Sequence, residues 1–290
     1  MTNEPTARRL RVATYNVHGC VGMDGQRSED RIAEVIASMS ADIVGLQELD
    51  LGRARSSHAD QAALIAKELG WKYHFHPAMR SGDEQYGNAI VSRFPIALKR
   101  VAEMPGAAPW YCREQRGAIW MQAETDLGPV HIINSHFGLG RSERSLQAKL
   151  LIGPTWLGSV PPDAPAILLG DFNSVRTSRA YRLIEAHLRD VRTLVRPSGA
   201  FRTFPTRFPS LAVDHIFVNP ALSPTHLNVH RTPLTRLASD HFPLVCELTL
   251  KPNNGALGMS DIEGKAAMGS GERAGERTSF NEFSGLDDAT

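Results

Sequence analysis

Polar side chains stand at the ends of several strongly apolar segments of this chain, where a hydrophobic core would not place them. Glu48 ends IVGLQE, His136 ends VHIINSH, and Asp171 follows AILLG in the run GDFN. Such residues converge on one rim of a sheet, where ligand sites commonly form. The full set is Asn16, His18, Glu48, His136, Asp171, Asn173, Asp214, His215, Asp240 and His241. Any one of them could be an ordinary turn residue, but the whole set indicates a functional site.

The residue types in this set favour hard cations and proton transfer. Asn16, Glu48 and Asp240 offer oxygen ligands. These suit Mg²⁺ or Mn²⁺ rather than Zn²⁺, since no Cys or HxxxH arrangement accompanies them. Asp214 and His241 could form an acid–imidazole pair that polarises a water molecule or a phosphate oxygen.

The run GDFN supplies a carboxylate and an amide, Asp171 and Asn173, from one tight turn. Together they could hold an attacking water against a phosphorus atom. Arg116 opens the segment RGAIW and could add positive charge to a phosphate clamp. No Ser or Cys stands in a nucleophile motif, which argues against covalent catalysis. The pattern predicts metal-dependent hydrolysis of a phosphate ester by in-line attack of water.

The elements that must position these residues alternate irregularly along the chain. Periodicity and capping signals predict helices at residues 28–39 (capped by Ser28), 58–69 (stopped by Gly70), 142–151 and 178–187. Apolar segments predict strands at residues 10–17, 42–47, 88–92, 117–123, 130–134, 166–169, 213–218 and 244–250. Several neighbouring strands have hairpin-like connections, so the pattern favours a mixed sheet in an α/β (α+β) fold over a parallel barrel.

Composition limits the class of protein. Of the 290 residues, 42% are hydrophobic, and the formal net charge of +1 gives no support to a general nucleic-acid or anionic-membrane binder. The three cysteines form no CxxC pair, and neither a signal peptide nor a run of ~18 apolar residues occurs. We therefore expect a cytoplasmic protein with one catalytic domain at residues 8–250. After Lys251 the chain is poor in large apolar residues, which predicts a disordered tail over residues 251–290.

The motifs TYNVHG, LQE, GNAIVSR, NSH, GDFN, VDHIF and SDHFP resemble, in order and spacing, those of the endonuclease/exonuclease/phosphatase superfamily. The resemblance extends from about Arg11 to Leu250. It implies a DNase I-like four-layer α/β/β/α sandwich, two packed sheets flanked by helices. The stretch QELD…RARSSHADQ looks like small stand-alone bacterial members, of which the sphingomyelinase-like and cardiolipin-synthase-associated proteins are the nearest.

By this resemblance each motif residue has an expected role. Asn16 and Glu48 match the metal-site amide and carboxylate, with Asp240 as the terminal metal-linked Asp. Asp171 matches the residue that orients or deprotonates the water, and Asn173 its transition-state-binding neighbour. His136 matches a phosphate-contacting position, Asp214 the orienting acid and His241 the catalytic His. Asn88 and Arg116 match motif-adjacent positions and are candidates for binding the substrate phosphate.

Two rival functions stay open at this stage. The first is a DNA or RNA nuclease, which would need a basic groove or a base-intercalating loop near the site. The second is a catalytically inactive binding protein on the same fold. The expected partner is a phosphate-ester substrate, either a phospholipid head group, nucleic acid or a small phosphodiester, without stable membrane insertion or an obligate protein partner. Trp110 and Tyr111 could form an aromatic ledge facing the substrate or pack in a loop, and Arg53 and Arg55 could contact an anionic substrate or lie in a solvated loop.

Overall fold

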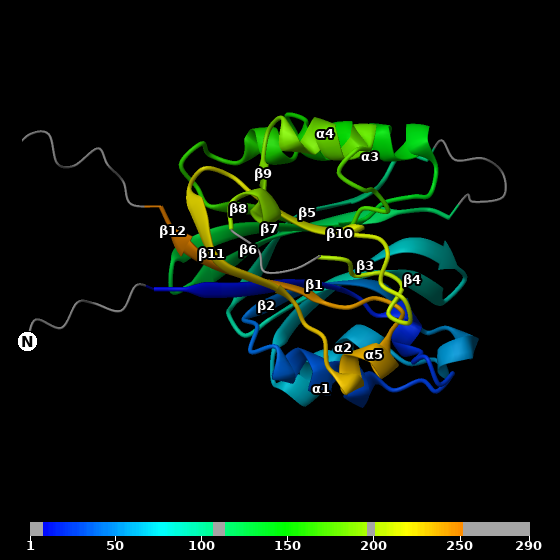
Figure 1. The fold of residues 1–290 in the computed structure, drawn as a ribbon. Coiled ribbons are helices and arrows are strands. Elements are labelled where there is room, and N and C mark those ends of the chain that lie inside the picture. Colours follow the sequence, from blue (N-terminus) through cyan, green and yellow to red (C-terminus); the bar gives the residue numbers. More distant parts are fainter. Residues whose placement is uncertain (1–7, 107–113, 196–200, 252–290) are drawn as a thin grey trace, which may run out of the picture. The chain divides into compact units, whose positions relative to one another are not determined.

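Two six-stranded mixed sheets form the centre of the computed structural model, which describes residues 8–106, 114–195 and 201–251 (Figure 1). The first sheet has the order β11-β12-β1-β2-β4-β3, and the second has the order β5-β6-β7-β8-β10-β9. The strands of the first sheet are β1 (Leu10–Asn16), β2 (Ile43–Leu51), β3 (Lys72–Ser81), β4 (Glu84–Ser92), β11 (Leu222–Val229) and β12 (Leu244–Leu250). Those of the second are β5 (Ile96–Glu103), β6 (Gly117–Thr125), β7 (Gly128–His136), β8 (Ala166–Asp171), β9 (Arg189–Asp190) and β10 (Asp214–Val218).

Helices cover the outer face of each sheet (Figure 1). Helices α1 (Glu29–Ser38), α2 (Gln61–Leu69) and α5 (Pro233–Ala238) lie on the first sheet, and α3 (Arg141–Ile152) and α4 (Arg179–Glu185) lie on the second. One apolar cluster joins the two sheets, with Val12 and Ile90 from the first and Ile132 and Leu169 from the second. The predicted four-layer α/β/β/α sandwich is therefore confirmed.

Local signals in the sequence explain most helix ends. The Ser28 side chain accepts a hydrogen bond from the backbone N–H of Arg31, as expected for the cap of α1. Gly70 ends α2 in the left-handed conformation. The predicted start of this helix at residue 58 is wrong, because Asp60 is the N-cap and accepts from Ala63 N–H.

The strands predicted at residues 10–17, 117–123 and 244–250 correspond to β1, β6 and β12. Sequence patterns did not predict β3, β5, β9, β11 or α5. The predicted tail beyond Lys251 lies outside the described residues, as do Trp110 and Tyr111. Within the part of the chain that the structure describes, no helix is long and apolar enough to cross a bilayer.

Candidate active site

Strand register brings the polar strand ends of the second sheet together. In the parallel pair β7–β8, His136 is opposite Asp171, and in the antiparallel pair β8–β10, Asp214 is opposite Asp171. The approach between β7 and β8 requires Gly170, which has φ 149°, because a Cβ there would collide with the carbonyl of Ser135. The last residues of β7 and β8 and the first residue of β10 therefore form one rim.

Glu48 comes to this rim from the first sheet through a bulge in β2. The register between β2 and β4 shifts between Leu46 and Leu49, and Glu48 has φ 64°, an uncommon value for a residue with a side chain. The buried Asn134 side chain on β7 donates hydrogen bonds to the carbonyls of Leu46 (2.9 Å) and Ala89 (2.8 Å) beside the bulge. A polar side chain of one sheet thus holds the irregular backbone of the other.

Asn16, at the end of β1, connects the two carboxylates. Its Nδ2 donates to Glu48 Oε1 at 2.8 Å and to Asp171 Oδ2 at 3.1 Å, while its Oδ1 accepts from the backbone N–H of His18 at 3.1 Å. Two carboxylates therefore converge on one amide, and Glu48 keeps 23% of its side chain exposed. The partly exposed Glu48 carboxylate offers the oxygen ligands that Mg²⁺ prefers, and the Asn16 oxygen keeps a second lone pair beside the bond from His18.

Asp171 lies at the centre of the rim. Its Oδ1 accepts from the backbone N–H of Asn173 at 2.9 Å, the local turn that Asp favours after a strand. Burial and the neighbouring Asp214 carboxylate raise the pKa of Asp171 to about 7, although His241 opposes the shift. A carboxylate with a pKa near neutrality can take a proton from water and release it again.

Asp214 and His241 form the predicted acid–imidazole pair. Asp214 Oδ2 lies 2.9 Å from His241 Nδ1, and His241 Nε2 lies 3.7 Å from Asp171 Oδ2. Burial lowers the pKa of His241, but the carboxylates of Asp214 and Asp171 outweigh it and raise the pKa to about 10. His241 is thus an imidazolium that points at Asp171. Arg192 donates to the backbone carbonyl of Asp214, which fixes the start of β10.

His136 is neutral, in contrast to the positively charged His241. Burial, followed by the positive charges of Arg116 and His241, lowers the pKa of His136 well below its ordinary value. Arg116 Nη1 lies 3.0 Å from His136 Nδ1 and also donates to Glu114 Oε1 at 2.8 Å. Because a guanidinium only donates, we assign His136 Nδ1 as the acceptor and the ring proton to Nε2, although the Asn173 amide nitrogen, 3.2 Å from Nε2, is a second donor. His136 Nε2 lies 3.5 Å from Asp171 Oδ2.

Asn173 completes the rim from the GDFN turn. Its backbone has φ 45°, and its Nδ2 donates to the carbonyl of Phe137 at 2.9 Å and lies 3.2 Å from His136 Nε2. The turn is therefore fixed by contacts with β7, and the amide stands beside both His136 and Asp171. The arrangement offers one buried carboxylate, one imidazolium, one neutral imidazole and an amide around a common point.

The chain matches a known protein family. The model of the Endonuclease/Exonuclease/phosphatase family matches residues 13–241. The chain belongs to this family. It is 28% identical over 256 residues to the uncharacterized protein YbhP of Escherichia coli K12, covering 83% of this chain and 96% of the relative.

Solved structures of the family have the same fold. An endonuclease/exonuclease/phosphatase from Beutenbergia cavernae superposes with a TM-score of 0.69 and 24% identity, covering 84% of this chain and 72% of the other. The mannosyl-6-phosphatase Bt3783 of Bacteroides thetaiotaomicron gives a TM-score of 0.64 and 23% identity, covering 83% and 99%. At these identities the likeness concerns the fold.

Some predicted residues lie at the margin of the family site. Asn88 is buried, and its Nδ2 donates to the carbonyl of Gly117 at 2.8 Å, so its amide holds the start of β6 beside Arg116. Asp240 is half-buried and adds to the negative charge around His241. His215, although next to Asp214 in sequence, faces a different buried group, with Nδ1 3.2 Å from Asp190 Oδ2.

The two arginines considered for substrate binding have partners in the protein. Arg55 donates to Asp50 Oδ2 and Oδ1 at 2.8 and 2.7 Å, and Arg53 lies 3.5 Å from the same carboxylate. Arg55 still keeps 50% of its side chain exposed, so both interpretations from sequence, the substrate contact and the solvated loop, stay open.

Sequence reasoning missed Glu114, Gln47 and Asn134. Glu114 pairs with Arg116, and Gln47 Nε2 donates to Asn134 Oδ1 at 2.7 Å. Asn134 lies inside a predicted strand. The only feature of the sequence that could have drawn attention to it is an amide side chain within an apolar run. Among the described residues, Asp171, Asp214 and His241 form a group whose ligand atoms all lie within 4.8 Å of one another, and Glu48 does not belong to it.

Proposed function

We propose that this protein is a divalent-metal-dependent hydrolase of phosphate esters that acts on phosphodiesters by in-line attack of an activated water. Its membership in the endonuclease/exonuclease/phosphatase family supports a phosphoester hydrolase. The single observation that carries the proposal is the position of Asp171. Its carboxylate accepts a hydrogen bond from Asn16, which also contacts Glu48. The same carboxylate lies 3.7 Å from the Nε2 of the His241 imidazolium.

Glu48, Asn16 and Asp240 would hold the cation, Mg²⁺ or Mn²⁺. When bound there, the ion neutralises charge that builds on the phosphate and on the leaving oxygen. The two carboxylates that share the Asn16 amide, Glu48 and Asp171, supply the negative charge that such an ion compensates. The sphingomyelinase-like branch of the family stays a prediction from sequence.

The side chains of this chain would then divide the proton chemistry. Asp171, with a pKa of about 7, orients the water and accepts its proton. His241, held by Asp214, donates a charge-assisted hydrogen bond to a phosphoryl oxygen. His136 donates from Nε2, and the Asn173 amide stabilises the same oxygens as charge develops. Arg116 keeps the proton of His136 on the side that faces the substrate.

The test is a substrate panel with the full-length protein in Mg²⁺. It compares bis-p-nitrophenyl phosphate, p-nitrophenyl phosphate, plasmid DNA, oligo-RNA, sphingomyelin and inositol phosphates. We expect diester hydrolysis to exceed monoester hydrolysis, to stop in excess EDTA and to return with Mg²⁺ or Mn²⁺. Full activity in EDTA would refute the dependence on a metal ion. If none of these esters were hydrolysed, the proposed hydrolase activity would be refuted.

A further inference from the structure

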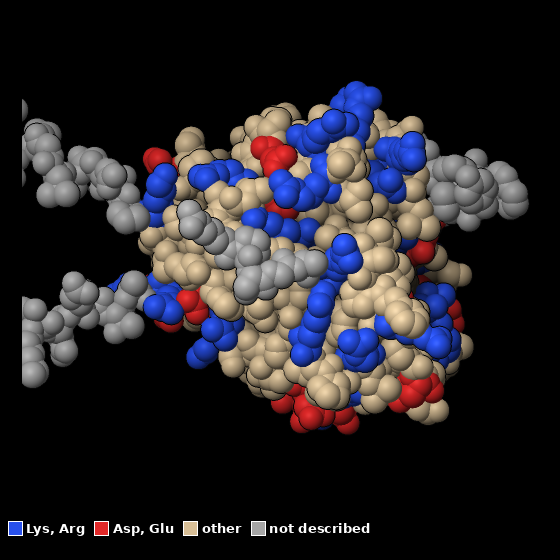
Figure 2. Space-filling view, viewed as in Figure 1, with Lys and Arg blue, Asp and Glu red and all other residues tan. Residues whose placement is uncertain are grey.

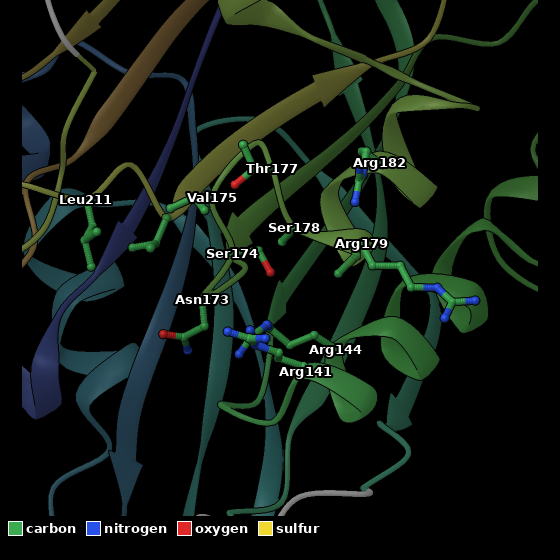
Figure 3. A pocket seen from close by; sticks show the side chains of 12 residues that line it. Arg141, Arg144, Asn173, Ser174, Val175, Thr177, Ser178, Arg179, Arg182 and Leu211 are labelled. Atoms are coloured by element: carbon green, nitrogen blue, oxygen red, sulfur yellow. The ribbon is translucent and has the colours of Figure 1, made fainter.

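A cavity of about 500 Å³ opens beside the site, with Asn173 in its wall (Figure 3). Because Asn173 also lies 3.2 Å from His136, the cavity and the candidate active site share one residue. A molecule whose phosphate lies at Asp171 could therefore extend into the cavity. The lining comprises Arg141, Arg144, Asn173, Ser174, Val175, Thr177, Ser178, Arg179, Ala180, Arg182, Leu211 and Val213.

Four arginines give this cavity a strong positive charge. Arg141 and Arg144 come from the first turn of α3, and Arg179 and Arg182 come from α4. Each pair has i,i+3 spacing, which places both side chains on one face of the helix. No Asp or Glu belongs to the described residues that line the cavity. Figure 2 shows basic side chains gathered over the layer in which α3 and α4 lie.

Among the described residues, the arginines of this cavity form no ion pair with a carboxylate, whereas arginines elsewhere in the fold do. Arg144 is anchored by donation to the carbonyl of Leu139 at 2.5 Å, so its guanidinium has a fixed position. Burial and the charge of Arg141 both lower the pKa of Arg144, although the neighbouring Glu143 acts in the opposite direction and raises it. Arg141, Arg179 and Arg182 are exposed to water, and an anion bound among these like charges would reduce their mutual repulsion.

A buried hydroxyl in the wall is an independent sign of a ligand. Ser174 is 2% exposed and lines the cavity, and its Oγ has no hydrogen-bond partner among the described residues. An unpartnered buried hydroxyl is costly, and native structures usually satisfy it with a ligand or water. In Figure 3 the Ser174 oxygen points toward the side of the cavity where Arg141 and Arg144 lie. It is therefore placed to donate to an anion that the arginines attract.

We propose that this cavity binds a second phosphate group of the substrate, next to the phosphate that is hydrolysed. The inference rests on the proposed function and narrows its substrate class to molecules that carry two neighbouring phosphates. No aromatic side chain is present in the described lining, so the cavity offers charge and hydroxyls rather than a surface for stacking a base. The second phosphate could belong to a nucleotide or to a phosphorylated polyol, and both share this recognition chemistry.

Calorimetric titration with matched ligands tests the proposal. The full-length protein carries Asp171→Asn, so that hydrolysis is slowed during the titration, and the buffer contains Mg²⁺. Thymidine 3′,5′-bisphosphate is compared with thymidine 5′-phosphate, and myo-inositol 1,4-bisphosphate with myo-inositol 1-phosphate. We expect at least one bisphosphate to bind about tenfold or more tightly than its monophosphate, the usual gain from charge-assisted hydrogen bonds. The pair with the larger ratio identifies the source of the second phosphate.

Three variants in the same background locate the effect. Arg141→Gln combined with Arg179→Gln should abolish the preference for the bisphosphate, and Ser174→Ala should reduce it. Arg100→Gln, on the edge strand β5 and outside the cavity lining, should leave it unchanged. Equal binding of bisphosphates and monophosphates, or an unchanged preference in the double arginine variant, would overturn the inference. Neither result bears on the hydrolysis of bis-p-nitrophenyl phosphate, which has only one phosphate. The proposed function is therefore tested independently of this inference.

Discussion

The link between the two sheets at Asn134 predicts a specific loss of stability. Asn134 is fully buried, donates to the carbonyls of Leu46 and Ala89, and accepts from Gln47 Nε2. These carbonyls flank the bulge that places Glu48 at the rim. Replacing Asn134 with Leu keeps the side chain at a similar size but removes every hydrogen bond that it makes.

The size of the effect follows from the groups left without partners. Two buried carbonyls each lose the Asn134 donor, and an unsatisfied buried group costs about 1–3 kcal/mol. Gln47 Nε2 retains contacts to Thr14 Oγ1 and Gly45 O, so its loss adds little. We therefore expect Asn134→Leu to lower the free energy of unfolding by about 2–6 kcal/mol, the sum for the two carbonyls. That is a large part of the stability of an ordinary domain, about 5–15 kcal/mol.

Urea denaturation followed by circular dichroism measures this loss. Asn219→Leu is a matched control, because Asn219 also joins two backbone groups, Ala166 N–H and the carbonyl of Ala164, but is only half-buried. Water can replace its hydrogen bonds, so we expect a loss of about 1 kcal/mol. The midpoint should fall in both variants at an unchanged m-value. If Asn134→Leu were no more destabilised than Asn219→Leu, the buried link would not hold the bulge.

Three further outcomes follow from the same geometry. Glu48→Gln should lower Mg²⁺ affinity, measured by titration of activity, while the melting temperature stays nearly constant; an unchanged metal dependence would remove Glu48 from the cation site. His241→Ala should reduce kcat by at least ~10²-fold and weaken substrate binding, measured by steady-state kinetics, since an electrostatic stabiliser is lost; normal turnover would refute its role. Burial raises the pKa of Asp190, but His215 and Arg192 outweigh it and lower the pKa to about 2. The Asp190 carboxylate therefore stabilises the fold above pH ~4, and this contribution is lost as the pH falls towards 2. Urea unfolding should therefore show Asp190→Asn destabilised at pH 7 by ~2 kcal/mol or more, with a gap from wild type that narrows between pH 4 and 2; a constant gap would contradict this.

The fold was predictable where burial gives strong local patterns. Central strands such as β1 and β8 are buried along nearly their whole length and read as continuous apolar runs. The missed strands have weaker patterns. β5 is an edge strand with mostly exposed residues, and β3 contains Pro77 at a register shift. Edge strands and bulges are set by tertiary pairing, which one sequence does not display.

The site was predictable for a different reason: its residues stand out against apolar strands. Asp171 and His241 were identified because a core argument could not explain them. The charge states were not predictable, since the low pKa of His136 and the high pKa of His241 depend on neighbours distant in sequence. The cavity was not predicted, because only the fold brings the arginines of α3 and α4 to one place.

The role of Asp171 is the central claim, and Asp171→Asn tests it most directly. The substitution keeps the shape of the side chain but removes the charge that would accept a proton from water. With bis-p-nitrophenyl phosphate and saturating Mg²⁺, we expect kcat to fall at least ~10²-fold, the usual scale for loss of a general base. Binding should be equal or tighter, because a negative charge near the phosphate is gone. Near-normal kcat in Asp171→Asn would contradict the account and leave the GDFN turn with a structural role only.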